Sequence, residues 1–462
     1  METSSLAFAI AACGGEIIRA ASASEFQRVC TDSRSAQAGD LFVALAGEKF
    51  DGHAFLDEVA AKGAVAVVIE QGRRLAALPE CGVIQVASTR AALGQLGAAY
   101  RRLFDLPVIA IGGSNGKTTT KELIASVLKQ KLATLWSEAS FNNDIGVPMT
   151  LLRLEKAHQA AVLEVGTNHP GELAPLVEMI QPRFGVITSI GREHLEFFGD
   201  VAGVAKEEGA LAELLPADGK LFISGDSEWT DGIAQRTKAS VVRVGLSERC
   251  EWRARNVRIS RQGTSFRVDA PDENFSRSYR VPLVGRHQAL NALFAIALGA
   301  ELGLSREEIL QGLAACAPAK MRMEVWETGG VHVLDDAYNA NADSMLAALQ
   351  VLQELPCKGR RVAVLGDMAE LGAHSESAHV EVGRNAARLG VAQLFAVGKM
   401  ASVMANGARE AGLNRVLEFG DVGAAATALK SFLKPGDTVL LKASRASRLE
   451  RVTMALRSGS GK

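Results

Sequence analysis

Short apolar runs alternate with turn residues and helical stretches along most of the chain. In residues 1–87 the runs "LFVAL", "AVAVVIE" and "GVIQVA" are separated by turn residues, which predicts a small α/β domain. The next stretch, "TRAALGQLGAAYRRLF", repeats apolar residues at helical spacing and predicts a helix. Pro107 then opens the following strand.

The middle of the chain, residues 88–318, has the pattern of a largely parallel sheet. Buried-strand runs alternate there with helical stretches; they read "PVIAI", "AAVLEV", "GVITSI" and "KLFISG". Continuous apolar runs are typical of strands that helices cover on both faces. Residues 251–283 alternate instead in the manner of β-hairpins, and "ALNALFAIALGAELG" predicts a helix that Gly303 can end.

The strand–helix pattern restarts after residue 318. "VHVLDD", "RVAVLGD", "QLFAVG" and "TVLLKAS" predict strands separated by helices, which makes residues 319–462 a doubly wound, Rossmann-like unit. We therefore expect an α/β protein of three domains, spanning residues 1–87, 88–318 and 319–462.

Composition narrows the classes of partner. The 462 residues are 48% hydrophobic and 22% charged, and their formal net charge of -1 gives no reason to expect nucleic acid or an anionic membrane as the main partner. The six cysteines are scattered, so we expect reduced thiols in a cytoplasmic protein.

No run approaches the roughly 20 apolar residues of a membrane span. "LAFAIAACGG" predicts a short helix stopped by Gly14 and Gly15.

A glycine-rich turn joins the first central strand to a helix in "VIAIGGSNGKTTTKELIASVLKQ". Backbone N–H groups of such a turn and of a helix N-terminus hold phosphate, so we expect a nucleoside triphosphate site in a P-loop ATPase-like domain. Lys117 would contact the outer phosphates, and Thr118 would offer its hydroxyl to Mg²⁺. The strict G-x-x-x-x-G-K-[ST] pattern fails because residue 111 is Ile, and a plain strand–turn–helix connection is the alternative.

Two further candidates follow apolar strands of the predicted central sheet. Glu164 ends "AAVLE", where a buried unpaired carboxylate would be costly. At the carboxyl edge of a parallel sheet it would instead be a Mg²⁺ ligand. His194, in "SIGREHLEFFG", lies at the same kind of edge. A capping Glu and a structural His are the alternatives.

Amide side chains cluster at two more places. "FNNDIGVP" brings Asn142 and Asn143 together before a proline, which suits either a polar ligand or the capping of a helix. In "VGRHQALNALFA", His287 and Asn291 lie four residues apart on one helix face. Asn291 is a candidate for reading an adenine edge, and a buried structural Asn is the alternative.

Polar residues also end the strands of the C-terminal unit. Asp335 and Asp336 adjoin at the end of "VHVLDD", which strand packing does not require, so we expect a ribose or metal contact. Strand ends of doubly wound units face the ligand crevice. The same reasoning, with ordinary loop polarity as the alternative, gives four candidate substrate contacts: Asp367, Glu370, Lys442 and Arg445.

Taken together, these segments resemble the Mur ligase family, ATP-dependent amide-forming enzymes of peptidoglycan precursor synthesis. "TDSRSAQAGDLFVALAGEKFDGHAF" is similar to the family's UDP-sugar-binding domain, and "GGSNGKTTTKE" is similar to its phosphate loop. Four segments resemble the branch that adds D-alanyl-D-alanine: "SFNNDIGVPMTLLRL", "AAVLEVGTNHPGE", "YNANADSM" and "GDMAELGAHSESAH". The branch adding the third amino acid has a Thr-Thr-Pro type of segment where "NND" stands here.

The resemblance implies a reaction, the last cytoplasmic step of pentapeptide precursor synthesis. The terminal carboxylate of UDP-N-acetylmuramoyl-tripeptide attacks the γ-phosphate of ATP, giving an acyl phosphate and ADP. The amine of D-alanyl-D-alanine then attacks the acyl carbon and expels phosphate. Most of the catalytic work in such a reaction is positioning and charge neutralisation.

The resemblance also implies site residues. Thr118 and Glu164 would bind one Mg²⁺, and His194 would help to bind a second. Nucleotide contacts would come from Gly113, Ser114, Asn115, Gly116, Lys117, Thr118, Thr119, Asn291, Arg322 and Asp335. Substrate contacts would come from Thr31, Asp32, Ser33 and Arg34 near the UDP moiety, and from Asn142, Asn143, Tyr338, Asn339, Asn341, Asp367, Glu370, Lys442 and Arg445.

Three positions depart from the family's pattern. The family commonly carries a carbamylated lysine after the histidine, but this chain has "VAKEEGALAELL", with Lys206 at the first lysine and Glu208 at the modified one. We expect no lysine carbamate at position 208: Glu208 itself supplies a catalytic carboxylate that supports the second Mg²⁺. Modification of Lys206, or of neither residue, is the alternative. Ala342 and Ala443 replace the Pro and Gly usual in the branch.

Rival functions exist inside and outside this class. A ligase for the third residue of the peptide stem and a folylpolyglutamate synthase share the phosphate loop, but neither explains "FNNDIGVP" together with "YNANADSM". A nucleotide-binding relative that has lost catalysis would bind ATP without substrate-dependent ADP release. We further expect a monomer whose free state holds the phosphate loop and Asp335 too far apart to share one nucleotide.

Overall fold

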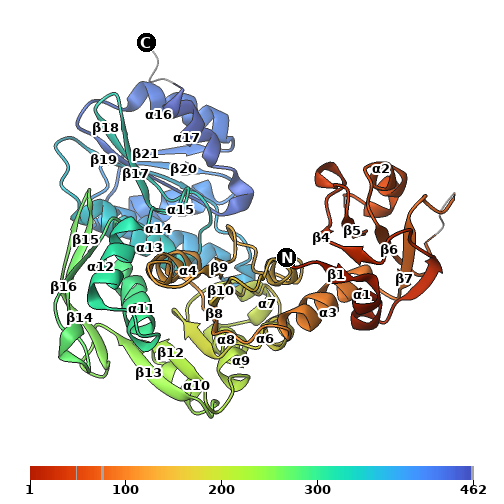
Figure 1. Cartoon of the computed structure of the whole chain (residues 1–462). Helices are drawn as coiled ribbons and strands as arrows, with labels where there is room; N and C mark the ends of the chain where they lie inside the picture. Colours follow the sequence, from red (N-terminus) through yellow and green to blue (C-terminus); the bar gives the residue numbers. More distant parts are fainter. Residues whose placement is uncertain (48, 74–76, 459–462) are drawn as a thin grey trace. The chain divides into compact units, whose positions relative to one another are not determined.

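The computed structural model describes residues 1–47, 49–73 and 77–458 (Figure 1). Glu48, within the segment that resembles the UDP-sugar-binding domain, lies outside the described residues. Internal contacts divide the chain into two compact units. The first comprises Met1–Ala110, Leu132–Thr167 and Leu173–Phe184, and the second comprises Ile111–Lys131, Asn168–Glu172 and Gly185–Lys462.

The first unit contains the small N-terminal α/β sheet. Its strand order is β2 (Glu16–Arg19), β7 (Gly82–Val86), β6 (Ala66–Glu70), β5 (Asp40–Val43) and β4 (Arg28–Cys30). Strands β4 to β7 run parallel, and β2 pairs antiparallel with β7. The predicted first helix is confirmed as α1 (Leu6–Cys13), which ends because Gly14 adopts the left-handed conformation with φ 62°. The unit also has β1 (Ser4–Ser5), β3 (Glu25–Phe26), η1 (Ser33–Ser35), η2 (Gly52–Phe55), α2 (Leu56–Ala61) and α3 (Thr89–Arg101).

A parallel strand pair completes the first unit. β9 (Thr134–Trp136) pairs with β10 (Ala160–Glu164), and every residue of β10 is buried. Helix α3 packs against α5 (Gly146–Leu151) and α6 (Leu173–Ile180). The chain then passes from the first unit to the second within β8 (Val108–Gly112).

The central part of the second unit combines parallel strands with antiparallel hairpins. β11 (Phe184–Ile187) is followed in sheet order by β12 (Lys220–Ser224), β13 (Ser240–Gly245), β14 (Trp252–Ser260), β15 (Gly263–Asp269) and β16 (Ser278–Val281). β12, β13 and β14 pair parallel, whereas β14, β15 and β16 pair antiparallel, which confirms the predicted hairpins. The helices are α4 (Lys117–Leu128), α7 (Leu195–Phe198), α8 (Val201–Glu208), α9 (Ala210–Glu213), α10 (Thr230–Ala234), α11 (His287–Glu301) and α12 (Arg306–Ala315), with η3 (Glu273–Phe275).

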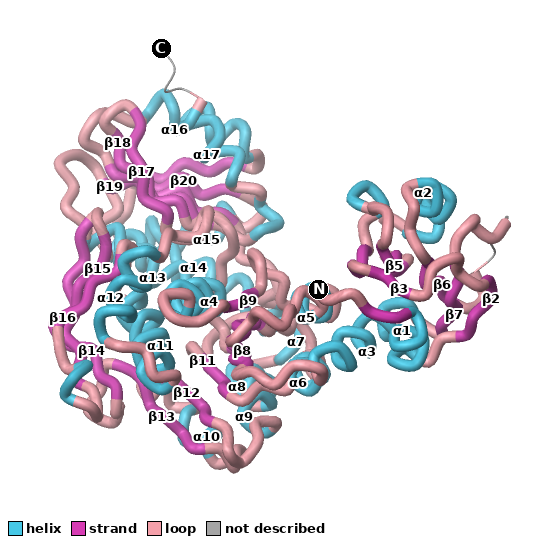
Figure 2. Tube along the Cα trace, in the orientation of Figure 1, coloured by secondary structure: helices cyan, strands magenta, loops and turns pink. Residues whose placement is uncertain are grey.

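The C-terminal part of the second unit is doubly wound. Its strand order is β17 (Glu324–Thr328), β18 (Val331–Asp335), β22 (Thr438–Lys442), β19 (Arg361–Gly366), β20 (Gln393–Val397) and β21 (Val416–Phe419). All neighbours are parallel except the β17–β18 hairpin. Helices cover both faces of the sheet (Figures 1 and 2): α13 (Ala342–Glu354), α14 (Ser375–Arg388) and α15 (Ala401–Glu410) on one, α16 (Val422–Phe432) and α17 (Glu450–Arg457) on the other.

Alternation along β18 shows why two cores form. Val333 packs into the core beneath α16 and α17, whereas the next residue, Leu334, packs into the core beneath α13, α14 and α15. The second of these cores also contains Leu195 of α7 and Val204 of α8. The central and C-terminal parts of the second unit therefore share buried apolar contacts.

Three global expectations can be compared with these findings. The α/β class with three domains is confirmed. The six cysteines, all within the described residues, form no disulfide. Within the described part of the chain, no helix combines the length and apolar character that crossing a membrane requires.

Candidate functional site

The predicted phosphate loop lies between β8 and α4, and two of its glycines have no room for a side chain. Gly113 has φ 109° and Gly116 has φ 87°, a region of backbone conformation that favours glycine. A Cβ atom at Gly113 would lie 2.5 Å from the Thr188 hydroxyl, and one at Gly116 would lie 2.6 Å from the Asn291 amide oxygen. The loop is therefore tightly enclosed, and α4 begins at Lys117 directly behind it, with its N-terminal amides turned toward the loop.

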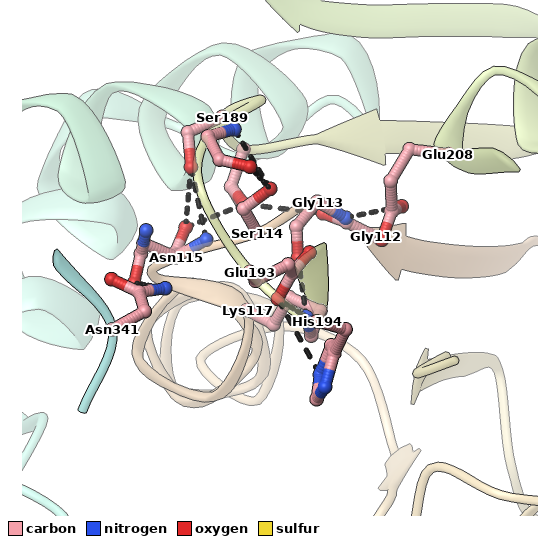
Figure 3. Close-up of polar contacts among 12 residues, drawn as sticks. Gly112, Gly113, Ser114, Asn115, Lys117, Ser189, Glu193, His194, Glu208 and Asn341 are labelled. Atoms are coloured by element: carbon pink, nitrogen blue, oxygen red, sulfur yellow. Dashed lines mark hydrogen bonds and ion pairs between the residues drawn. The ribbon is translucent and has the colours of Figure 1, made fainter. Parts of the chain in front are cut away.

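The two residues that follow β11 hold this loop through hydrogen bonds. The N–H of Ser114 donates to the carbonyl of Ser189 at 2.8 Å, and the N–H of Asn115 donates to the Ser189 hydroxyl at 3.0 Å (Figure 3). The Thr188 hydroxyl donates to the carbonyl of Asn115 at 2.7 Å. Sequence reasoning missed both residues, although their hydroxyls follow the apolar run of β11, which is the available signal.

Three charged side chains lie beside the loop in Figure 3: Lys117, Glu193 and Glu208. The Gly113 N–H donates to Glu208 Oε2 at 2.6 Å, and Lys117 Nζ lies 3.5 Å from Glu193 Oε2. Lys117 also donates to the carbonyl of Gly113. Glu208 is buried, and its Oε1 atom has no hydrogen-bond partner among the residues that the structure describes.

Burial raises the pKa of Glu208 to about 7. The positive charge of Lys117 opposes this shift, the negative charge of Glu193 adds to it, and the Gly113 N–H opposes it. A carboxylate held in this way retains one oxygen for a cation. Glu193 was also missed from the sequence, although it stands next to the predicted His194.

His194 follows β11 and faces two carboxylates. Its Nδ1 atom is hydrogen-bonded to Glu370 Oε2, and its Nε2 atom lies 3.9 Å from Glu193 Oε2. The hydrogen bond with His194 lowers the pKa of Glu370 against the opposing effect of burial. Glu370, predicted as a substrate contact, is thus placed against a candidate metal ligand.

The C-terminal part of the second unit reaches the phosphate loop directly. Asn341 Nδ2 donates to Asn115 Oδ1 at 3.1 Å, and an Arg322 guanidinium nitrogen donates to the Thr118 hydroxyl at 3.3 Å. The Arg322 guanidinium also lies 4.0 Å from the centroid of the Tyr338 ring. The expected separation of the phosphate loop from the C-terminal domain is therefore wrong for this structure.

The adjacent aspartates at the end of β18 have different surroundings. Asp335 is fully buried, accepting from the Thr453 hydroxyl at 2.8 Å and from the Ala337 N–H at 3.3 Å. Burial raises its pKa. Asp336 instead accepts from Lys442 Nζ at 2.5 Å and is only partly buried. Asp335 is thus part of the protein interior, whereas Asp336 lies at the carboxyl ends of the strands.

Other predicted contacts of the C-terminal part take part in local hydrogen bonds. Asp367 accepts from the N–H groups of Lys399 and Met400, both at 2.9 Å. Lys442 Nζ also donates to the carbonyl of Asn339 at 3.1 Å. The Arg445 guanidinium lies 5.8 Å from the Tyr338 ring centroid. Lys442, Asn339 and Arg445 are thus brought together with Tyr338, whereas Asp367 holds the start of the β20–α15 connection.

Asn291 lies against the phosphate loop with its amide group already engaged. Its Oδ1 atom accepts from the Thr120 hydroxyl at 3.3 Å, and its Nδ2 atom donates to Gln288 Oε1 at 2.9 Å. The side chain is buried. These contacts correspond to the structural alternative, and they hold the Asn291 amide where it leaves no room for a side chain at Gly116.

The predicted residues of the first unit form two separate groups. Asn142 Nδ2 donates to Glu164 Oε1 at 2.9 Å, and the Ser137 hydroxyl accepts from the N–H of Glu164 at 3.1 Å. Asn143 Oδ1 accepts from the Gly146 N–H at 2.9 Å, which holds the turn before α5. Glu164 is buried at the end of β10, as its place in the sequence predicts.

The second group surrounds η1, after β4. Thr31, at the end of β4, precedes Asp32, which accepts from the Arg34 N–H at 3.0 Å and from its guanidinium at 2.6 Å. These hydrogen bonds lower the pKa of Asp32 to about 2. The carbonyl of Ser33 accepts from Lys62 at 2.7 Å. The Arg34 side chain is 87% exposed, so it is available to an anionic ligand.

The site can be tested for its fit to Mg²⁺. Among the described residues, no group of three or more His, Cys, Asp or Glu side chains forms a ready-made cage. Mg²⁺ in nucleotide sites usually takes one or two carboxylates together with phosphate oxygens and water. Buried Glu208, with its unengaged Oε1, is an oxygen donor of this kind beside the phosphate loop. These residues therefore fit the cation.

Family comparisons cover most of the chain. The family model described as Mur ligase family, catalytic domain, matches residues 25–101. The model described as Mur ligase middle domain matches residues 111–299, and the model described as Mur ligase, glutamate ligase domain, matches residues 321–445.

Individual relatives match at nearly full length. The Escherichia coli (strain K12) protein named UDP-N-acetylmuramoyl-tripeptide–D-alanyl-D-alanine ligase is 39% identical over 93% of each chain. The Bacillus subtilis (strain 168) protein of the same name is 34% identical, over 93% of this chain and 92% of its own. A crystal structure of MurF from Acinetobacter baumannii superposes with a TM-score of 0.91 at 34% identity, covering 99% of both chains. The Thermotoga maritima MurF ligase in complex with ADP superposes with a TM-score of 0.82 at 26% identity, covering 94% of this chain and 97% of its own.

Proposed function

The chain belongs to the Mur ligase family, and from that premise we propose that it joins D-alanyl-D-alanine to UDP-N-acetylmuramoyl-tripeptide while ATP is cleaved to ADP and phosphate. The observation that carries this proposal is the 39% identity, over 93% of each chain, to an enzyme of that name. The product is the pentapeptide precursor of peptidoglycan. Its soluble nucleotide substrates place the reaction in the cytoplasm, and we propose that the chain acts as a monomer.

The reaction has two transfers. A terminal carboxylate oxygen of the tripeptide bonds to the γ-phosphorus of ATP, the bond to the β-γ bridging oxygen breaks, and ADP leaves. The amine nitrogen of the dipeptide then bonds to the acyl carbon, the acyl carbon–oxygen bond breaks, and phosphate leaves while the amine releases a proton. Both transfers depend on holding reactants in line and neutralising phosphoryl charge.

The second unit supplies groups suited to the nucleotide. Lys117 and the N-terminal amides of α4 bind the phosphates, and the narrow space at Gly113 and Gly116 keeps this backbone in place. Arg322, whose guanidinium donates a hydrogen bond to the Thr118 hydroxyl, adds a positive charge from the C-terminal part. The Tyr338 ring beneath Arg322 limits where this guanidinium can move.

We assign Mg²⁺ ligands as the sequence predicts them. By that assignment, Thr118 and Glu164 would be ligands of one cation, and His194 and Glu208 would support a second. When bound, Mg²⁺ offsets the charge of the phosphate oxygens. Glu208 provides a fixed carboxylate for this purpose, and the Gly113 N–H holds its other oxygen at 2.6 Å. Glu193 joins this group because it lies between Lys117 and His194.

The substrate contacts follow the same assignment except at Glu370, and one nucleotide contact also changes. The exposed Arg34 suits the diphosphate of the UDP group, together with Thr31, Asp32 and Ser33. Among the nucleotide contacts, Asp336 replaces Asp335 at the end of β18 because Asp335 is buried. Glu370 acts through His194. The other predicted substrate contacts keep their roles: Asn142, Asn143, Tyr338, Asn339, Asn341, Asp367, Lys442 and Arg445.

The decisive experiment measures ADP release by the purified protein in ATP and Mg²⁺. UDP-N-acetylmuramoyl-tripeptide and D-alanyl-D-alanine are supplied singly and together. We expect turnover only with both, and none when a single amino acid replaces the dipeptide. Turnover with a single amino acid would assign the chain to another branch of the family, and ATP binding without turnover would mark it as a non-catalytic relative.

A further inference from the structure

A histidine and a glutamate join two loops of the second unit that are far apart in the sequence. His194 follows β11, and Glu370 lies between β19 and the 3-10 helix η4 (Gly372–His374). The Nδ1 atom of His194 is hydrogen-bonded to Glu370 Oε2. The carbonyl of Glu370 also accepts from the N–H of Glu196 at 3.0 Å. The side-chain contact is therefore reinforced by a backbone contact two residues from the histidine.

Backbone conformation indicates that this contact is built into the fold. His194 has φ 49° and Glu370 has φ 60°, so both partners adopt the left-handed conformation without being glycine. Such residues persist where their surroundings fix them, and they concentrate at functional sites. Gly372 has φ 50°, and a Cβ atom there would lie 3.0 Å from the Cα atom of Glu196. The glycine thus lets the C-terminal loop approach the loop of His194 closely.

The orientation of the imidazole follows from its contacts. A histidine that donates its Nδ1 proton to a carboxylate carries its lone pair on Nε2. Here Nε2 is on the side of Glu193, whose Oε2 atom lies 3.9 Å away and 3.5 Å from Lys117 Nζ. The Phe198 ring packs edge-on against the imidazole with the centroids 6.4 Å apart. The lone pair is thus directed toward the phosphate-loop side.

We propose that Glu370 is a positioning residue that fixes the imidazole of His194 so that its Nε2 lone pair faces the divalent cation of the bound nucleotide. This inference rests on the proposed function in placing that cation beside the phosphate loop. Carboxylates that hold metal-binding histidines commonly orient the ring and raise its basicity. Glu370 belongs to the C-terminal part of the chain. The imidazole of His194 is therefore held in this orientation only while the C-terminal part is docked on the central part.

The first test uses the free protein and does not depend on catalysis. Long-range ¹H–¹⁵N NMR of ¹⁵N-histidine-labelled protein reports the tautomer of His194, assigned by the loss of its signal in His194→Gln. We expect the proton on Nδ1 in the wild type and a mixed tautomer in Glu370→Ala. Glu376→Gln is the matched control because this exposed carboxylate lies six residues along the chain, in the first turn of α14. An unchanged His194 tautomer in a folded Glu370→Ala variant would overturn the proposal.

The second test measures cation affinity. Mn²⁺ is titrated into each protein with ADP present and followed by electron paramagnetic resonance. We expect Glu370→Ala to weaken Mn²⁺ binding about tenfold, Glu370→Gln to weaken it less because its amide oxygen still accepts from Nδ1, and Glu376→Gln to leave it unchanged. Equal Mn²⁺ affinity in Glu370→Ala and the wild type would contradict the proposal.

A third variant separates positioning from mere docking of the C-terminal part. Arg192 contacts the C-terminal part at Asp343 and Glu381, away from the imidazole. Because Arg192→Gln weakens docking but leaves the Glu370 carboxylate in place, we expect it to shift the tautomer of His194 much less than Glu370→Ala does. If Arg192→Gln altered the tautomer as strongly as Glu370→Ala, Glu370 would act only by holding the two parts together, and its positioning role would be rejected. All three tests remain informative if the chain proves to use other substrates.

Discussion

Glu208 shows how one residue changes the chemistry expected at a site. Its Oε2 atom is held by the Gly113 N–H, whereas Oε1 has no hydrogen-bond partner among the described residues. A lysine at this position would need a carbamate to present two oxygens. Glu208 presents two oxygens without any modification, so the charge beside Lys117 does not depend on dissolved CO₂.

Bicarbonate therefore distinguishes the wild type from a lysine variant. We expect wild-type ADP release to be the same with and without added bicarbonate. Glu208→Lys should lose about 10–100-fold in activity in CO₂-depleted buffer, because cation support is lost, and should recover in part when bicarbonate is added. Glu208→Gln is the control, since its amide cannot be carbamylated and should not respond. Bicarbonate stimulation of the wild type that Lys206→Ala abolishes would show instead that Lys206 is the modified residue.

Single residues also show where sequence reasoning stops. The loop from Gly113 to Thr118 was identified because its chemistry is local: glycines, a lysine and a hydroxyl in sequence order. Asp335 and Asp336 could not be separated, because neighbouring residues of a strand point to opposite faces and the last residue of β18 was unknown. The contact of His194 with Glu370 spans 176 residues, so no local pattern reveals it.

At the scale of elements, the strands with continuous apolar runs and the alternating hairpin strands were predicted, whereas β9, β17 and β21 were missed. The runs at β8, β10, β11, β12, β18, β19, β20 and β22 are all buried. β17 and β21 are edge strands with polar residues, and β9 has only three residues. A strand at the edge of a sheet is less buried than a central strand, so its sequence does not need a continuous apolar run. Strand prediction here depends on such runs, and these strands lack them.

The start of two neighbouring C-terminal strands is held by a partly buried ion pair. Arg360 precedes β19 and Asp437 precedes β22; their side chains meet at 2.6 Å, and the N–H of Arg360 donates to Asp437 at 2.9 Å. The Lys434 N–H donates to the same carboxylate at 2.9 Å. Burial alone would raise the pKa of Asp437, but these three donors together lower it below its ordinary value.

The sign of this pKa shift predicts how stability depends on pH. The folded protein holds the Asp437 proton more weakly than the unfolded chain, so the ion pair stabilises the fold above the unfolded pKa of about 4. This stabilisation is lost as the pH falls through the lower, folded pKa. We expect Asp437→Asn to lower the free energy of unfolding by about 2 kcal/mol at pH 7.

Thermal unfolding by calorimetry at several pH values tests this prediction. The gap in Tm between wild type and Asp437→Asn should be largest at neutral pH and should narrow below about pH 4. Asp231→Asn is a suitable control, because Asp231 pairs with Arg243 but its side chain is 65% exposed. We expect this substitution to change Tm little. A gap that stays constant down to strongly acidic pH would contradict the role given to the Asp437 charge.

At the scale of the whole molecule, the second unit joins two domains that the sequence pattern treats as independent. Domain patterns come from strands and helices, which repeat in each domain and carry no information about docking. The observed docking uses contacts that are not periodic: the Asn341–Asn115 hydrogen bond, the Arg322–Thr118 hydrogen bond and a shared apolar core. This is the physical reason why the expected free-state separation was wrong here.

Arg192 connects these two domains through ion pairs with two carboxylates. Its Nε atom donates to Asp343 at 2.8 Å, in the first turn of α13, and its Nη1 atom donates to Glu381 of α14 at 2.6 Å. The side chain is 30% exposed, so each pair alone contributes little. Both ion pairs use the same guanidinium, so the entropy cost of ordering the Arg192 side chain is incurred once for two interactions. We therefore expect the network to stabilise the docked arrangement by about 1 kcal/mol.

Removing this guanidinium should therefore favour undocking without unfolding either domain. We expect Arg192→Gln to raise the KM for ATP about fivefold, which corresponds to about 1 kcal/mol, and to leave Tm nearly unchanged. Hydrogen exchange should increase at residues 189–196 and at the start of α13. Added salt screens the ion pairs of Arg192, so it should raise the KM of the wild type for ATP toward that of the variant. Arg243→Gln is the charge-matched control, because its pair with Asp231 lies outside this interface. If Arg192→Gln changed neither KM nor exchange, docking would rest on the apolar core and on the contacts of Asn341, Arg322 and Glu370.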